Sequence, residues 1–110
     1  MSTASVSSLK FATATSGDQV LKMAARFRVL GEPLRLRLVH QLLQGEFNVT
    51  TLSHQLGTTQ PNISKHLKVL QAAGIVTRRT HKSSAFYGIT DATVVDLCDT
   101  ARTGLPVAHA

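Results

Sequence analysis

The chain is poor in cysteine and in long hydrophobic runs, and both deficits narrow the classes of protein to which it can belong. Its single cysteine, Cys98, cannot form an internal disulfide, which excludes the small disulfide-stapled domains of oxidising compartments. No apolar run approaches the roughly 20 residues of a membrane-spanning helix. The N-terminus lacks the basic and then apolar order of a signal peptide. We therefore expect a cytoplasmic protein that does not associate with a membrane.

Acidic side chains are missing from residues 47–90. The whole sequence of 110 residues carries 12 Lys and Arg against 6 Asp and Glu, a formal net charge of +6. The cations of the acid-free stretch are Lys65, Lys68, Arg78, Arg79 and Lys82. A stretch with charge of one sign predicts a polyanionic partner, above all nucleic acid. A basic solvated surface without a partner is the alternative.

Patterns that would support catalysis are also missing. No histidine stands at a spacing from a serine, a cysteine or another histidine that implies a nucleophile–base pair. We therefore predict a protein without enzymatic activity and without a cofactor. In this interpretation His66 packs inside the protein or contacts a phosphate.

Residues 58–74, with the sequence TTQPNISKHLKVLQAAG, predict a DNA-recognition helix. Thr59 has the side chain of an N-cap, and Pro61 falls in the first turn, where a missing N–H costs nothing. Gly74 suits the left-handed residue that follows a helix. The apolar residues that form a stripe for burial at helical spacing are Ile63, Leu67 and Leu70.

The opposite side of this helix carries amide, hydroxyl and ammonium groups, which bond to base edges and phosphates. The residues predicted to bind DNA from this helix are Gln60, Asn62, Ser64, Lys65 and Lys68. Taken alone, the stretch is equally compatible with an amphipathic helix whose polar side is only solvated.

The remaining elements predict a mainly α winged helix-turn-helix with a β-hairpin wing. We expect helices over residues 18–30, 34–43 and 49–56 before the recognition helix. After it we expect strands over 75–80 and 85–90 around a basic tip at 81–84, and then a helix that Asp91 caps and that runs to about residue 103. Two helices joined by a glycine-containing turn, with a hairpin beside the second, make this fold. Residues 17–105 form its single domain, after a disordered tail at residues 1–16.

The hairpin is expected to act as a wing that lies along the phosphates or enters the minor groove. Its residues predicted to bind DNA are Arg78, Arg79, Lys82 and Ser83. Arg35 and Arg37 lie off the apolar stripe of the second helix, and we expect one of them to reach a phosphate.

With its elements in this order, the chain resembles the ArsR/SmtB family of bacterial winged-helix repressors over about residues 20–103. The segments that carry the resemblance are GEPLRLRL, QPNISKHLKVLQAAGIV and the wing ending in AFYGI. The resemblance implies a homodimer, built through the first and last helices, that binds an imperfect palindrome in double-stranded DNA and is released by an effector. The residues then expected at the dimer interface are Leu21, Ala24, Phe27, Val94, Val95 and Cys98.

The resemblance does not extend to the metal sites of the family. Many members bind metals or arsenicals through Cys-x-Cys at the start of the third helix, where this chain has Asn48-Val49-Thr50. Others use histidine and carboxylate ligands on the last helix, where Val94 and Val95 follow Asp91. We therefore predict no metal at these sites, and the sequence identifies no effector.

Two choices stay open at the level of sequence. Cys98 is either a small buried side chain, which we favour, or one half of a disulfide across the dimer. The function is either sequence-specific repression of transcription or, as the alternative, a winged-helix module that binds another protein. The acid-free basic half of the chain favours DNA.

Overall fold

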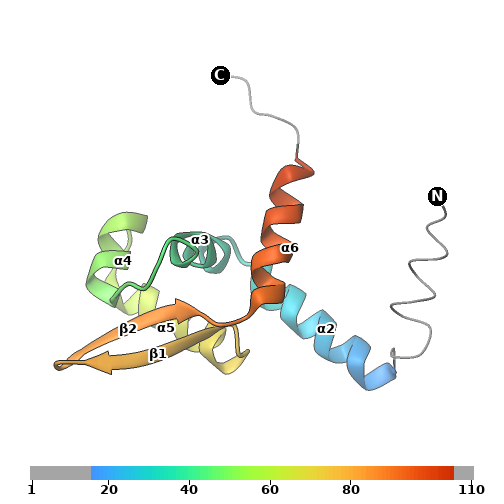
Figure 1. Cartoon of the computed structure of the whole chain (residues 1–110), viewed down its shortest axis with the longest axis horizontal. Coiled ribbons are helices and arrows are strands. Elements are labelled where there is room, and N and C mark those ends of the chain that lie inside the picture. The colour runs from blue at the N-terminus through green and yellow to red at the C-terminus, as the bar shows by residue number, and fades with distance from the viewer. Residues whose placement is uncertain (1–15, 106–110) are drawn as a thin grey trace.

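The computed structural model describes residues 16–105. Over this range five helices and an antiparallel hairpin follow in the order α2, α3, α4, α5, β1, β2, α6 (Figure 1). This order confirms the predicted winged helix-turn-helix. The predicted disordered tail lies outside the described residues, except for Ser16. No helix in residues 16–105 combines the length and hydrophobicity needed to cross a membrane.

The first described helix, α2 (Gly17–Leu30), begins at a reciprocal cap. The hydroxyl of Ser16 accepts a hydrogen bond from the backbone N–H of Gln19 at 3.1 Å, and the Gln19 side chain accepts from the backbone N–H of Ser16 at 2.9 Å. Ser16, rather than Asp18, is therefore the N-cap of this helix. Asp18 lies in the first turn, where its negative charge suits the positive end of the helix dipole.

Helices α3 (Pro33–Leu42) and α4 (Val49–Leu56) also begin at polar caps. Glu32 accepts from the backbone N–H of Arg35 at 2.9 Å, and Asn48 accepts from that of Thr51 at 2.8 Å. Gly57 ends α4 in the left-handed conformation, at φ 67°. The predicted bounds of α4 are confirmed, and those of α3 are shifted by one residue.

The wing consists of β1 (Val76–His81) and β2 (Ser84–Ile89), joined by the two residues Lys82 and Ser83. Their φ values of 49° and 69° match the left-handed pair of a type I′ turn, whose twist suits a tight hairpin. The predicted tip at residues 81–84 is wrong by one residue on each side, because His81 and Ser84 form the last pair of the ladder.

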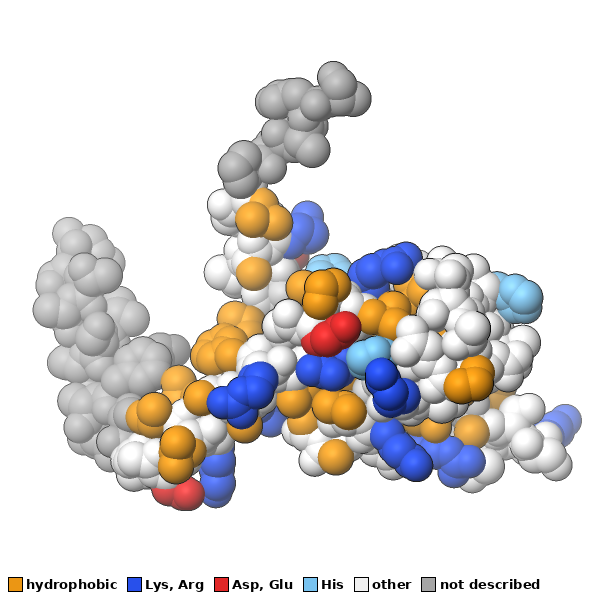
Figure 2. All heavy atoms as spheres, turned by 180° about the vertical axis from the view of Figure 1, so that it is seen from behind, with side chains coloured by type: hydrophobic (Ala, Val, Ile, Leu, Met, Phe, Trp, Pro, Cys, Tyr) orange, Lys and Arg blue, Asp and Glu red, His pale blue; other side chains and the backbone are white. Residues whose placement is uncertain are grey.

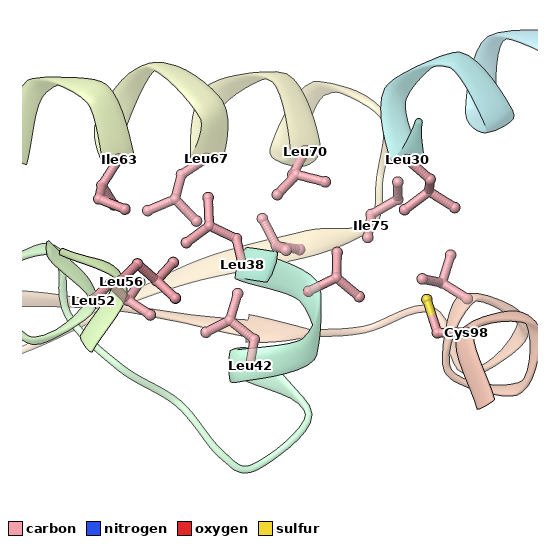
Figure 3. Packing of buried hydrophobic residues seen from close by; sticks show 13 residues of the cluster. Leu30, Leu38, Leu42, Leu52, Leu56, Ile63, Leu67, Leu70, Ile75 and Cys98 are labelled. Atoms are coloured by element: carbon pink, nitrogen blue, oxygen red, sulfur yellow. The ribbon is translucent and has the colours of Figure 1, made fainter. Parts of the chain in front are cut away.

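One apolar core joins α3, α4, α5 (Gln60–Ala72) and the base of the wing. Ile63, Leu67 and Leu70 point from α5 towards Leu38 of α3, and all are fully buried (Figure 3). The predicted stripe of α5 is therefore confirmed. The other buried members of the core are Leu30, Val39, Leu42, Leu52, Leu56, Ile75, Val76, Val94 and Cys98. This packing holds α5 rigidly, with its opposite side turned outward.

Helices α2 and α6 (Ala92–Thr103) lie at the end of the molecule away from the hairpin turn, and both project from the body (Figure 1). Within the protomer only Leu30 of α2 is buried. Leu21 remains 71% exposed and Phe27 55% exposed. Figure 2 shows this apolar surface along α2, at the lower left of the view.

Candidate nucleic-acid interface

The outward side of α5 is built by its cap and its buried stripe. Thr59 accepts from the backbone N–H of Asn62 at 3.3 Å, and Pro61 follows in the first turn, as predicted. Burial of the apolar stripe leaves four of the five residues predicted to bind DNA exposed. These four residues are Gln60, Ser64, Lys65 and Lys68. Together they present an amide, a hydroxyl and two ammonium groups without a carboxylate beside them.

Asn62 differs from its neighbours because it is half-buried. Its amide N–H donates to the hydroxyl of Thr58 at 3.0 Å, across the turn between α4 and α5. The bond orients the amide and leaves its oxygen free to accept. Sequence reasoning missed this contact, although Thr58 lies one helical turn before Asn62, a spacing at which side chains meet.

Behind α5, Arg35 links three elements inside the protein. Its Nε donates to the backbone oxygen of Val29 in α2 at 2.7 Å, and its Nη1 lies 3.4 Å from Nδ1 of His66 in α5. His66 is only 7% exposed, so of its two predicted roles the structure supports packing. The Arg35 guanidinium is thus held internally, whereas Arg37 is exposed.

The same junction includes the carboxylate of Glu32. The hydrogen bond from the backbone N–H of Arg35 holds the pKa of this carboxyl below its usual value, against the opposing effect of desolvation. The carboxylate therefore stays ionised while it caps α3.

The wing presents two of its predicted DNA-binding residues at the turn. Lys82 and Ser83 occupy its two central positions and are exposed. Arg78 is exposed on β1 and takes part in none of the ion pairs found within residues 16–105. These side chains are free to meet phosphates.

Arg79 is placed differently from the other wing cations. Its Nε and Nη2 both lie 2.8 Å from Oε1 of Glu46, in the loop between α3 and α4. Its guanidinium also lies 5.4 Å from the centre of the Phe86 ring on β2. The sequence offers no local signal for this pair, because 33 residues separate its members.

The predicted dimer residues fall into two groups. Leu21, Ala24, Phe27 and Val95 are exposed on α2 and α6. The structure corrects the placement of Val94 and Cys98, which are 2% and 5% exposed because they face the core of their own protomer. Leu97, which faces outward from α6, takes the surface position instead.

Burial also affects the chemistry of Cys98. Desolvation raises the pKa of its thiol, so the reactive thiolate is disfavoured. An apolar groove of about 400 Å³ adjoins it between α2, α3 and α6, with Phe27, Leu36 and Leu97 in its walls. The environment is that of a packing residue, the interpretation favoured from the sequence.

The groups considered as metal ligands have other partners. Asn48 caps α4, and Asp91 caps α6 by accepting from the backbone N–H of Thr93 at 3.0 Å. The Asp91 carboxylate also pairs with Arg26 of α2. Within residues 16–105, no three His, Cys, Asp or Glu side chains gather as a metal-binding group.

Comparisons with known proteins place this geometry among bacterial regulators. Residues 32–78 match the family described as bacterial regulatory protein, arsR family. The biofilm growth-associated repressor of Xylella fastidiosa is 38% identical over 82 residues, which cover 74% of this chain and 72% of that protein. The probable mercury resistance operon repressor of Streptomyces lividans is 36% identical over 76 residues, covering 69% of this chain and 61% of that protein.

Solved structures show the same architecture. The transcriptional repressor BigR from Xylella fastidiosa superposes with a TM-score of 0.76 at 34% identity, covering 83% of this chain and 93% of that one. The homodimeric winged helix-turn-helix DNA-binding domain Mb0332 from Mycobacterium bovis superposes with a TM-score of 0.72 at 22% identity, covering 83% of this chain and 87% of that one. The second similarity concerns the fold alone.

Proposed function

Since this chain belongs to the arsR family of bacterial regulatory proteins and is a DNA-binding transcriptional regulator, we propose that it represses transcription in the cytoplasm as a homodimer bound to an imperfect palindrome. The observation that carries this proposal is the outward side of α5. It is anchored from behind by fully buried residues and offers amide, hydroxyl and ammonium groups in front. A rigid helix with such a surface fits the major groove.

Within α5, the polar side chains divide into base readers and phosphate ligands. Gln60 and Asn62 carry amides, which can pair with adenine through an acceptor and a donor, and the Ser64 hydroxyl can serve any base. Lys65 and Lys68 supply charges for phosphates, together with Arg78 and Lys82 from the wing, and the Ser83 hydroxyl can donate a hydrogen bond to a phosphate. Loss of a good base contact costs about 1–3 kcal/mol of discrimination.

Dimerisation is supported by the exposed apolar surface of α2 and α6. Exposing so many large apolar side chains to water is unfavourable. The side chains concerned are Leu21, Phe27, Val95 and Leu97. A second copy with the same surface would cover them through a twofold axis. Two α5 helices would then meet half-sites about one helical turn of DNA apart, roughly 34 Å.

The proposal contains neither a metal effector at the usual family position nor an enzymatic reaction. Asn48 stands where the metal-binding relatives need a thiolate, and its side chain is used to cap α4. Within residues 16–105, no hydrogen bond joins a histidine to a serine or to Cys98 as a nucleophile–base pair.

The experiment that tests this function is fluorescence anisotropy with DNA from the protein's own upstream region and with random DNA of equal length, over a series of salt concentrations. We expect a preference of about a thousandfold or more for the upstream DNA. Gln60→Ala and Asn62→Ala should reduce that preference. Gln71→Ala, an exposed amide at the other end of α5, is the matched control and should not.

Equal binding to both DNAs, falling steeply with salt, would contradict the proposal. It would reduce the interface to a basic surface and favour a protein partner for the winged-helix fold. A preserved preference in Asn62→Ala alone would leave the function intact but remove Asn62 from the readers.

A further inference from the structure

The pair formed by Glu46 and Arg79 joins the wing to the body of the protomer. Four ion pairs occur within residues 16–105, and this is the one among them that involves the wing. The others lie within α2, within α6, or between α2 and the cap of α6. The wing is otherwise attached through its base and through one backbone rung, where Phe47 and Tyr87 exchange hydrogen bonds of 3.2 and 2.9 Å.

Gly88 allows the Glu46 side chain to cross β2 and reach Arg79 on β1. Because Phe47 pairs with Tyr87, the preceding Glu46 lies against Gly88, the next residue of β2. A Cβ atom at position 88 would lie 3.1 Å from Cγ and 3.3 Å from Oε2 of Glu46. Gly88 does not have a positive φ, so its backbone conformation does not require glycine. The absence of a side chain at position 88 instead leaves room for the Glu46 side chain.

An aromatic ring of β2 also orients Arg79. Phe86 is its direct partner across the hairpin, and the ring lies beneath the guanidinium. A cation held by a carboxylate and an aromatic ring has lost much of the freedom that a phosphate ligand uses. To reach a phosphate, Arg79 would also leave the Glu46 carboxylate unpaired at a surface that approaches a polyanion.

From this arrangement, and on the basis of the function proposed above, we propose that Glu46 and Arg79 form a clasp that sets the orientation of the wing on DNA. Arg79 is then a positioning residue, and the phosphate contacts of the wing come from Arg78 and Lys82. Glu46, an acidic residue in contact with the wing, thereby supports DNA binding, although its charge alone would oppose it.

The direction in which one substitution changes the affinity for DNA distinguishes the clasp from simple electrostatic repulsion. Glu46→Gln removes a negative charge, so repulsion alone predicts tighter DNA binding. The clasp predicts binding weaker by about three- to tenfold, because the wing loses its anchor. Glu46 is partly exposed, so this variant should fold, which thermal unfolding checks. Tighter binding of the upstream DNA would overturn the proposal.

A charge swap provides the second test and includes its own control. Arg79→Glu should weaken DNA binding. Adding Glu46→Arg should then raise the affinity for DNA at least tenfold, because the ion pair forms again with its two charges exchanged. The same Glu46→Arg change in a Lys82→Glu background measures the general effect of replacing this anion by a cation, a change of two charge units, where no pair with Arg79 can form. The proposal requires a clearly larger recovery in the first background, with the salt slope returning to that of the unchanged protein. Equal recovery in the two backgrounds would refute the clasp and make Arg79 a phosphate ligand.

The unchanged protein distinguishes a failure of the clasp from a failure of the proposed function. If it shows no preference for upstream DNA, the function proposed above is wrong. If it shows the preference but the swap fails, the function stands and the clasp falls.

Discussion

Lys82 offers the cleanest test of the wing as a phosphate-binding element. It occupies the first central position of the hairpin turn, at φ 49°, and is exposed. Asparagine is among the residues that best tolerate this left-handed conformation and is favoured in type I′ turns. Lys82→Asn should therefore remove the charge while keeping, or slightly stabilising, the hairpin.

The magnitude follows from counterion release. Each phosphate neutralised on duplex DNA contributes about 0.9 to the slope of log affinity against log salt concentration. A homodimer places two copies of Lys82 on the DNA, so the slope should become shallower by about 2. Between 1 M and 0.1 M salt, this change of slope lowers the affinity for DNA by at most roughly 60-fold at 0.1 M. At 1 M salt the affinity should hardly change.

The assay is anisotropy over that salt range with both upstream and random DNA. Because phosphates carry no sequence, the affinity for both DNAs should fall alike. Lys22→Gln is the control, since Lys22 pairs with Asp18 on the exposed surface of α2 and should leave the slope unchanged. An unchanged slope in Lys82→Asn, in a protein with unaltered thermal unfolding, would refute the assignment of the wing turn to phosphates.

Three further predictions concern stability and assembly. Leu67→Ala should lower the free energy of unfolding by about 2–5 kcal/mol in urea titration, because Leu67 is fully buried between α5 and α3; a loss below 1 kcal/mol would contradict that packing. Phe27→Ser should shift the dimer towards monomer in analytical ultracentrifugation, and Ala72→Ser, on the exposed side of α5, should not. The lowered pKa of Glu32 means that its carboxylate adds stability above the usual value of 4.5 and loses this contribution as the pH falls through the lower pKa of the folded state. The melting temperature should therefore drop more steeply below pH 4.5 in the unchanged protein than in Glu32→Gln, and parallel curves would speak against the cap as the cause.

Local chemistry explains why much of the fold could be predicted. Caps and left-handed glycines act over one turn of chain, so Asn48 and Gly57 define α4 without help from the rest of the protein. The spacing of Ile63, Leu67 and Leu70 likewise determines which side of α5 is buried, and thereby which side can meet DNA. The order of the elements follows from such signals, and with it the family resemblance.

The tertiary structure decided the contacts whose partners are distant in sequence. An apolar pattern shows that α6 buries a side, but Val94 and Cys98 face the core rather than the surface because of how α6 docks. The partner of Arg79 depends on a loop 33 residues away and on the missing side chain of Gly88. Side-chain charge and periodicity are properties of a segment, whereas a clasp exists only when two segments have been brought together.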